Sequence, residues 1–213
     1  MSELAFSVLG VRAEKHAAVP TLMFRLRIDE TTGTAVHAIL LRSQIRIEPQ
    51  RRRYAALEQQ NLLGLFGEPA RWGDTQRSFL WTHATLNVPG FERSLEIELP
   101  ITCTYDLEVT AAKYFQALEG GEVPLLLLFS GTIFAERENG YSVQQVPWDK
   151  EATCKLPLSL WRELMDAYFP DCGWIRVGRE SLNALQRFRA ERALLTWDAT
   201  FAALIEGAKE QVP

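Results

Sequence analysis

The sequence predicts an α+β fold: a mainly antiparallel, curved, sandwich-like sheet with a mid-chain helix and C-terminal helices. Of its 213 residues, 47% are hydrophobic, which is enough to bury a sizeable core. Hydrophobic residues alternate with period two up to about residue 156 and follow helical spacing afterwards. Strands first and helices last favour antiparallel pairing over alternating βαβ units. We expect a single domain over residues 1–213, with strands and an inserted helix near 54–66 in residues 1–156, and a helical part at 157–213.

The expected strands rest on alternation. In residues 20–28, Leu22, Phe24 and Leu26 share one face with Ile28. Residues 35–48 alternate in the same way, so the two segments should form an antiparallel hairpin across the turn ETTGT, with one solvated face. Further strand-like segments lie at 4–12, 78–88, 94–109, 125–135 and 139–146, and the last two should form a hairpin through ERENG.

The expected helices rest on apolar spacing of three and four residues. The mid-chain helix at 54–66 ends at Gly67. A short helix fits 111–118, although a continued strand is an alternative there. After Pro157, which a helix start tolerates, the expected helices are 158–169, 180–194 and 197–207, the last capped by Thr196.

Composition excludes several function classes. The net charge of −4 and pI of about 5.5 oppose a dedicated nucleic-acid binder. The longest apolar run, VPLLLLF, is far shorter than the roughly 20 residues that a transmembrane helix needs. Three cysteines without a CxxC pair, and a start unlike a signal peptide, indicate a reducing cytoplasm.

Motifs of catalysis are missing from the sequence. No glycine-rich phosphate loop and no G-x-S-x-G nucleophile motif occurs, and the histidines and cysteines lack metal-ligand spacing. We therefore expect no cofactor, no metal and no catalytic residue.

The most prominent local feature of the sequence is the run Arg51, Arg52 and Arg53, which follows Pro49 at the expected junction between a strand and a helix. Three interpretations are open: structural ion pairs, a protein–protein contact, and a phosphate ligand. Acidic residues close by favour ion pairs. Asp74 and Asp149 lie in probable loops, where an aspartate either closes a turn or does acid–base chemistry.

Tryptophans near loops are the other candidates for recognition. Trp72, Trp148 and Trp174 would mark a partner surface if exposed and would anchor their loops if buried. The complete set of candidate partner-binding residues is Arg51, Arg52, Arg53, Trp72, Asp74, Trp148, Asp149 and Trp174.

Several blocks together resemble one uncharacterised bacterial family. They are IRIEPQRRRY, LFGEPARWGDT, FLWTH, CTYDLEV, AAKYFQAL, PLLLLFSGTIF, VPWDKEA and LPLSLWRELMDAYFP. Members of that family are encoded beside genes for high-affinity, actinobacterial-type NiFe-hydrogenases. The resemblance implies an accessory role in assembling or stabilising such an enzyme, and it assigns no catalytic residue.

A weaker resemblance concerns layout alone. The first strand, FSVLGVRAEK, the strand pairs after it and the stretch ELMDAYFPDCGWIRVGRESLNAL are similar in order to the SecB export chaperone. This likeness implies a SecB-like sheet and transfers no client-binding residue.

We therefore expect a cytoplasmic, non-catalytic binding or assembly-accessory protein, whose sheet presents a partly apolar face or rim to a protein partner. Hydrogenase subunits or their maturation factors are the expected partners. The alternative is a small-ligand-binding protein or enzyme that uses the arginine and aspartate loops. One deep pocket that gathers these loops would favour the alternative, and a shallow apolar surface lined by tryptophan would favour the first expectation.

Overall fold

The structure is a computed structural model that describes residues 3–103, 109–137, 140–172 and 177–209. Residues 1–172 and 173–213 form two compact units, which are described separately. The organisation of the whole chain as one domain stays a prediction.

The first unit contains a three-stranded antiparallel sheet in the order β1-β2-β5. These strands are Leu4–Ala13, Thr21–Glu30 and Ser94–Thr102. β5 ends seven residues before the expected strand 94–109 does, and Val109 already begins a helix.

A second, five-stranded sheet is also antiparallel throughout. Its core order is β4-β3-β6, and both β7 and β8 pair with the other edge of β6. The bounds are β3 Val36–Ile47, β4 Phe79–Val88, β6 Glu122–Arg137, β7 Gly140–Gln145 and β8 Glu151–Pro157. The α+β class with antiparallel sheets is thus confirmed.

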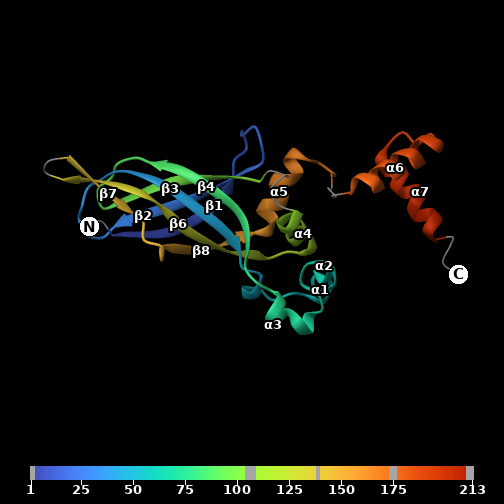
Figure 1. Cartoon of the computed structure of the whole chain (residues 1–213), viewed down its shortest axis with the longest axis horizontal. Coiled ribbons are helices and arrows are strands. Elements are labelled where there is room, and N and C mark those ends of the chain that lie inside the picture. Colours follow the sequence, from blue (N-terminus) through green and yellow to red (C-terminus); the bar gives the residue numbers. More distant parts are fainter. Residues whose placement is uncertain (1–2, 104–108, 138–139, 173–176, 210–213) are drawn as a thin grey trace. The chain divides into compact units, whose positions relative to one another are not determined.

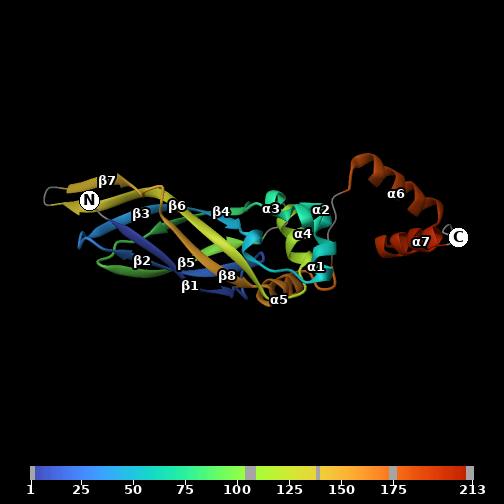
Figure 2. The ribbon, with the colours of Figure 1, turned by 90° about the horizontal axis from the view of Figure 1, so that it is seen from below.

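The main core lies between the two sheets (Figure 2). Phe6 of β1 stacks on Phe129 of β6, with ring centroids 4.3 Å apart. Phe24 of β2 meets Trp81 of β4 edge to face at 6.5 Å. The alternating residues of each strand therefore form the inner layers of a sandwich.

The expected hairpin of residues 20–28 with 35–48 is wrong, because β2 and β3 belong to different sheets. Alternation gives each strand one buried face, and here the two faces oppose each other across the core instead of lying side by side. The connection is held by Glu30, whose buried carboxylate accepts backbone N–H bonds from Thr32, Gly33 and Thr34 at 2.7–3.0 Å.

Gly131 lies between the part of β6 that pairs with β8 (122–128) and the part that pairs with β7 (132–137). That residue has φ +142°, and a Cβ there would lie 2.0 Å from the carbonyl oxygen of Leu40. Only glycine fits this close approach. β8 was not expected from the sequence, although Ala152, Cys154 and Leu156 alternate there.

Short helices cover one end of the sandwich (Figure 1). The expected mid-chain helix is confirmed but divided at Leu62, and the helix near 111–118 is confirmed over a continued strand. The elements are η1 Pro49–Arg51, α1 Ala56–Asn61, α2 Leu63–Phe66, η2 Pro69–Arg71, α3 Trp72–Thr75, α4 Val109–Ala117 and α5 Leu158–Tyr168.

An aromatic cluster joins these helices to the strands. Tyr114 of α4 is fully buried and meets Tyr54 and Phe79 edge to face. Its neighbour Phe115 stacks on Trp161 of α5 at 4.8 Å. Truncating such a buried aromatic typically costs about 3–5 kcal/mol, so the cluster fixes the helical end on the sandwich.

The second unit is a pair of helices, α6 Arg179–Glu191 and α7 Trp197–Lys209, as the apolar spacing predicted. Thr196 caps α7, since its Oγ1 accepts the backbone N–H of Ala199 at 3.1 Å. Among the helices that the structure describes, none is both long and apolar enough to cross a bilayer.

Candidate functional site

Arg52, the middle residue of the arginine run, is largely buried and links separate segments of the chain; we call its set of contacts the Arg52 strut. Its Nη2 donates to Glu58 Oε1 at 2.5 Å and to the Gly120 carbonyl at 2.6 Å, and its Nη1 donates to the Glu122 carbonyl at 2.8 Å. The side chain is only 11% exposed. It ties the segment after β3 to the turn that leads into β6, so it is not available to a ligand.

Glu58 is the partner that makes this strut possible. Its carboxylate also accepts backbone N–H bonds from Ala55 at 3.0 Å and Glu119 at 2.8 Å. Burial acts to raise the pKa of Glu58, but these N–H bonds and the Arg52 guanidinium outweigh burial and lower it. Glu58 is therefore ionised at neutral pH and holds Arg52 in place.

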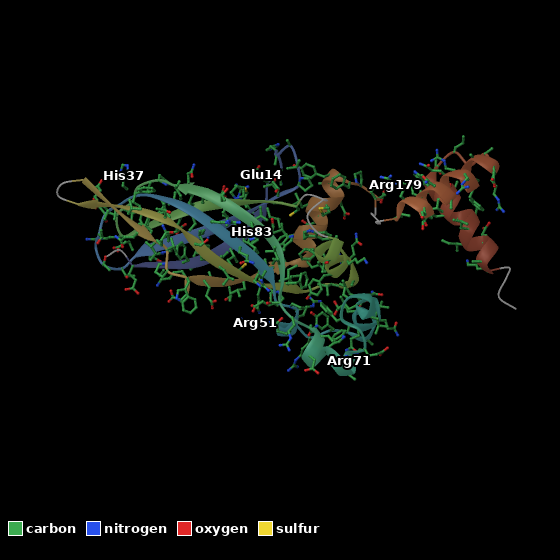
Figure 3. All side chains as sticks on the ribbon, in the orientation of Figure 1. Glu14, His37, Arg51, Arg71, His83 and Arg179 are labelled. Carbon is green, nitrogen blue, oxygen red and sulfur yellow. The ribbon has the colours of Figure 1, made fainter. Side chains whose placement is uncertain are left out.

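The other two arginines point outward. Arg51 lies 3.1 Å from the buried carboxylate of Glu48, and Arg53 is exposed. Figure 3 shows Arg51 at the helical end of the unit, together with Arg71, whereas His37 lies at the opposite end of the strands. The run is thus split into one internal and two external side chains.

The expected loop around Trp72 and Asp74 is wrong, because both residues belong to the short helix α3. Trp72 anchors this helix. Its indole N–H donates to the Gly67 carbonyl at 2.8 Å, and its ring meets Tyr54 and Phe66 edge to face at 5.3 and 6.0 Å. Asp74, two residues later, has an exposed side chain. In α3 the aspartate therefore faces solvent and the tryptophan faces the protein.

Trp148 is the opposite case. It lies between β7 and β8 and is 92% exposed, and the adjacent Asp149 is exposed as well. A tryptophan this accessible stabilises nothing in the monomer and is typical of a contact residue. Trp174, the third candidate tryptophan, lies outside the described residues.

The candidates do not converge on one pocket. Arg52 attaches at Glu122, while the Trp148 loop attaches where Phe129 N–H donates to the Lys150 carbonyl. These two points of β6 are seven residues apart, which corresponds to about 23 Å at a typical strand rise. Arg52 and the loop that carries Trp148 and Asp149 therefore do not form one site.

An apolar surface near Trp148 was missed by the sequence reasoning. On the outer face of the five-stranded sheet, Phe134 pairs with Val143 of β7, which is 62% exposed. Leu40 of β3 is 52% exposed, and the residues beside it on the neighbouring strands are Thr132 of β6 and Gln145 of β7. We call Leu40, Phe134, Val143 and Trp148 the Val143 patch. Its signal was the Leu40–Leu41 pair, since only one of two adjacent strand residues can face the core.

The outer face of the three-stranded sheet has a different character. Arg12 binds both oxygens of Glu98 at 2.8 and 2.7 Å and also Glu14 at 2.8 Å. Arg27 pairs with Asp29 at 2.9 Å. One face is thus covered by ion pairs and the other carries exposed apolar side chains.

An open groove of about 490 Å³ lies between α1, α2 and α4. It is lined by Asn61, Gly64, Leu65, Lys113, Gln116 and Ala117. None of the candidate residues lines it. In the part of the chain that the structure describes, no three His, Cys, Asp or Glu side chains come together as a metal site.

Comparison with known proteins identifies the family. A family of unknown function (DUF6084) matches residues 1–213, so the chain belongs to that family. No curated protein matches the chain.

Solved structures resemble the chain only remotely. The CARDB domain of PF1109 from Pyrococcus furiosus has a TM-score of 0.28 and 10% identity, over 73% of this chain and 92% of that one. Spo0M, a sporulation control protein from Bacillus subtilis, has a TM-score of 0.31 and 13% identity, over 74% and 49%. The putative ApaA protein from Bordetella pertussis has a TM-score of 0.28 and 13% identity, over 73% and 93%. At these scores the likenesses carry no functional argument.

Proposed function

We propose that this chain is a non-catalytic binding protein that supports the assembly or stability of a NiFe-hydrogenase in the cytoplasm. The Val143 patch is its contact surface. The proposed partner is a hydrogenase subunit or a maturation factor, which the family resemblance of the sequence blocks supports.

The observation that carries the proposal is the high exposure of two apolar side chains, Val143 in β7 and Trp148 in the loop after β7. Val143 in β7 and Trp148 in the loop after it expose apolar surface to water in the free protein, which is unfavourable. Large exposed apolar patches mark protein contact sites, and we propose that these side chains belong to such a site. Tryptophan is also among the residues that contribute most to binding energy.

The distribution of charged side chains also favours the outer face of the five-stranded sheet as the contact surface. The ion pairs of Arg12 and Arg27 cover the three-stranded sheet, so a partner that binds there has to displace or desolvate them. The Val143 patch carries no such penalty. The partner therefore needs an apolar surface and no strongly charged one.

Co-purification from a host that makes the hydrogenase tests the proposal. Trp148→Ala should melt like the wild type, because the side chain packs against nothing, yet bind about 30-fold more weakly, which corresponds to about 2 kcal/mol. Glu96→Ala, an exposed change on the outer face of β5, is the matched control and should bind like the wild type.

Trp161→Ala reports on the folded core instead. Trp161 is buried against Phe115, so its truncation should lower the melting temperature strongly. If Trp148→Ala binds as well as the control does, the Val143 patch is not the contact surface. If the wild type associates with neither hydrogenase subunits nor maturation factors, the proposed partner is wrong, and small-molecule stabilisation screens become the next test.

A further inference from the structure

The second unit has a surface that its own two helices leave uncovered. In the described residues 177–209, Thr200 alone is fully buried, and no hydrophobic side chain is. Helices of 13 residues are marginal by themselves and depend on packing of an apolar face. The pair therefore has apolar surface to bury beyond the contact between α6 and α7.

One stripe of α7 has the spacing of a helix–helix seam. Asp198, Phe201, Ile205 and Ala208 are separated by three, four and three residues, which is the coiled-coil repeat. Ile205 is 56% exposed, Asp198 and Ala208 are exposed, and Phe201 is half-buried. The contact between α6 and α7 borders this stripe: Arg189 of α6 covers the ring of Trp197 at 4.7 Å, and that ring lies 6.3 Å from the ring of Phe201.

The charges along this stripe are self-complementary. Asp198 stands at its start and the exposed Lys209 at its end. Eleven residues separate them, which is close to three full helical turns, so the two side chains project from the same side of α7. Two copies of α7 placed antiparallel bring Asp198 of each beside Lys209 of the other, and Phe201 beside Ile205. A parallel arrangement would bring like charges together at both ends.

We propose that α7 is a self-association surface through which two copies of this chain pair antiparallel about a two-fold axis, with the Asp198–Phe201–Ile205–Ala208 stripe as the seam. Such a contact uses the same patch on both copies, as a closed dimer requires. It is independent of the hydrogenase proposal, which concerns the other unit.

The seam is short, and this sets the expected strength. α7 has 13 residues and is therefore about 20 Å long. It buries less than the roughly 800 Å² per partner of a standard stable interface. The dimer should therefore be weak and depend on concentration.

Analytical ultracentrifugation of the full chain over a wide concentration range tests the proposal. The wild type should shift from its monomer mass of 24.2 kDa toward twice that value as concentration rises. Ile205→Asp should weaken the association at least tenfold. Asn183→Asp adds the same charge at an exposed position of α6 outside the seam and should leave it unchanged.

A charge exchange decides between pairing and a purely local role. Asp198 and Lys209 also suit the helix dipole, acid at the start and base at the end. If they served α7 alone, Asp198→Lys combined with Lys209→Asp would be the worst variant. Antiparallel pairing predicts that each single exchange weakens the dimer, because it places like charges opposite each other, and that the double exchange restores it.

Two results would overturn the proposal. A wild type that stays monomeric at every concentration leaves the stripe to another partner or to the first unit. A dimer that survives Ile205→Asp unchanged is held by a different surface. Far-UV circular dichroism on each variant establishes that α7 remains helical.

Discussion

Replacing Arg52 with alanine tests whether the arginine run is structural. The change removes three hydrogen bonds that join the segment after β3 to the turn before β6, one of them to a carboxylate. It leaves Glu58 buried, with its charge balanced only by two backbone N–H groups. A purely surface role for the run predicts no such consequence.

The magnitude follows from these contacts. Removing one member of a buried ion pair typically costs about 3–5 kcal/mol. Because Glu58 keeps two N–H donors, we expect the lower end, about 3 kcal/mol. For a unit of this size, about 3 kcal/mol lowers the melting temperature by roughly 6–12 °C. Arg53→Ala, a change of the same type at an exposed position, should cost less than about 0.5 kcal/mol.

Thermal and urea unfolding at several pH values provide the assay. Burial acts to raise the pKa of Glu58, but its hydrogen bonds and Arg52 lower it. A lowered folded pKa gives stability that is present above the unfolded value of about 4.3 and is lost as pH falls through the folded value. The difference in free energy of unfolding between the wild type and Arg52→Ala should therefore be largest at pH 7 and should decrease in acid.

Two outcomes contradict this reasoning. If Arg52→Ala melts within a degree of the wild type, the strut contributes nothing measurable. If the melting temperature of Arg53→Ala falls as far as that of Arg52→Ala, the run acts through its total charge and not through the buried contacts of one residue.

Gly131→Ala should lower the free energy of unfolding by at least about 2 kcal/mol in urea titrations, because the new Cβ meets a β3 carbonyl at a φ that alanine avoids; unchanged stability would refute the requirement for glycine at this position. A thiol reagent at pH 8 should label the exposed Cys172 at once, the half-buried Cys154 more slowly, and the buried Cys103 only on unfolding. Burial raises the pKa of Cys103 and of Cys154 to about 12. Rapid labelling of all three would contradict the packing. Glu30→Gln should destabilise by about 1–3 kcal/mol at pH 7 and by little in acid, since the pKa of Glu30 is lowered by its hydrogen bonds against burial. A loss that persists undiminished at low pH would show that shape and not charge matters there.

Strand positions could be predicted from the sequence, but strand partners could not. β2 and β3 each show clean alternation, which fixes the buried face of a strand and says nothing about the strand beside it. The connection from one sheet to the other depends on Glu30. Its carboxylate accepts hydrogen bonds from three backbone N–H groups of the connection, which have no partner strand. An acidic residue before a turn is too common to reveal this role from sequence.

The tryptophans show the same limit for the candidate site. Trp72 and Trp148 both follow a proline-containing loop stretch, and their neighbours in sequence are equally polar. One is held by the Gly67 carbonyl and two aromatic rings, and the other touches solvent. The difference arises from α3 folding back on the aromatic cluster, a tertiary contact that no local pattern encodes.

The role of the arginine run becomes clear only when the contacts of each of its three residues are considered separately. A phosphate site needs guanidinium groups that converge and remain unpaired until the ligand arrives. Here the middle group is consumed by Glu58 and two carbonyls, and Arg51 stands against Glu48. Because adjacent residues project in different directions, the sequence places three charges together that the fold separates. The exposed charged candidates of this unit form no converging phosphate site, and Trp148 and Val143 are exposed apolar side chains, which is why the contact surface is sought there.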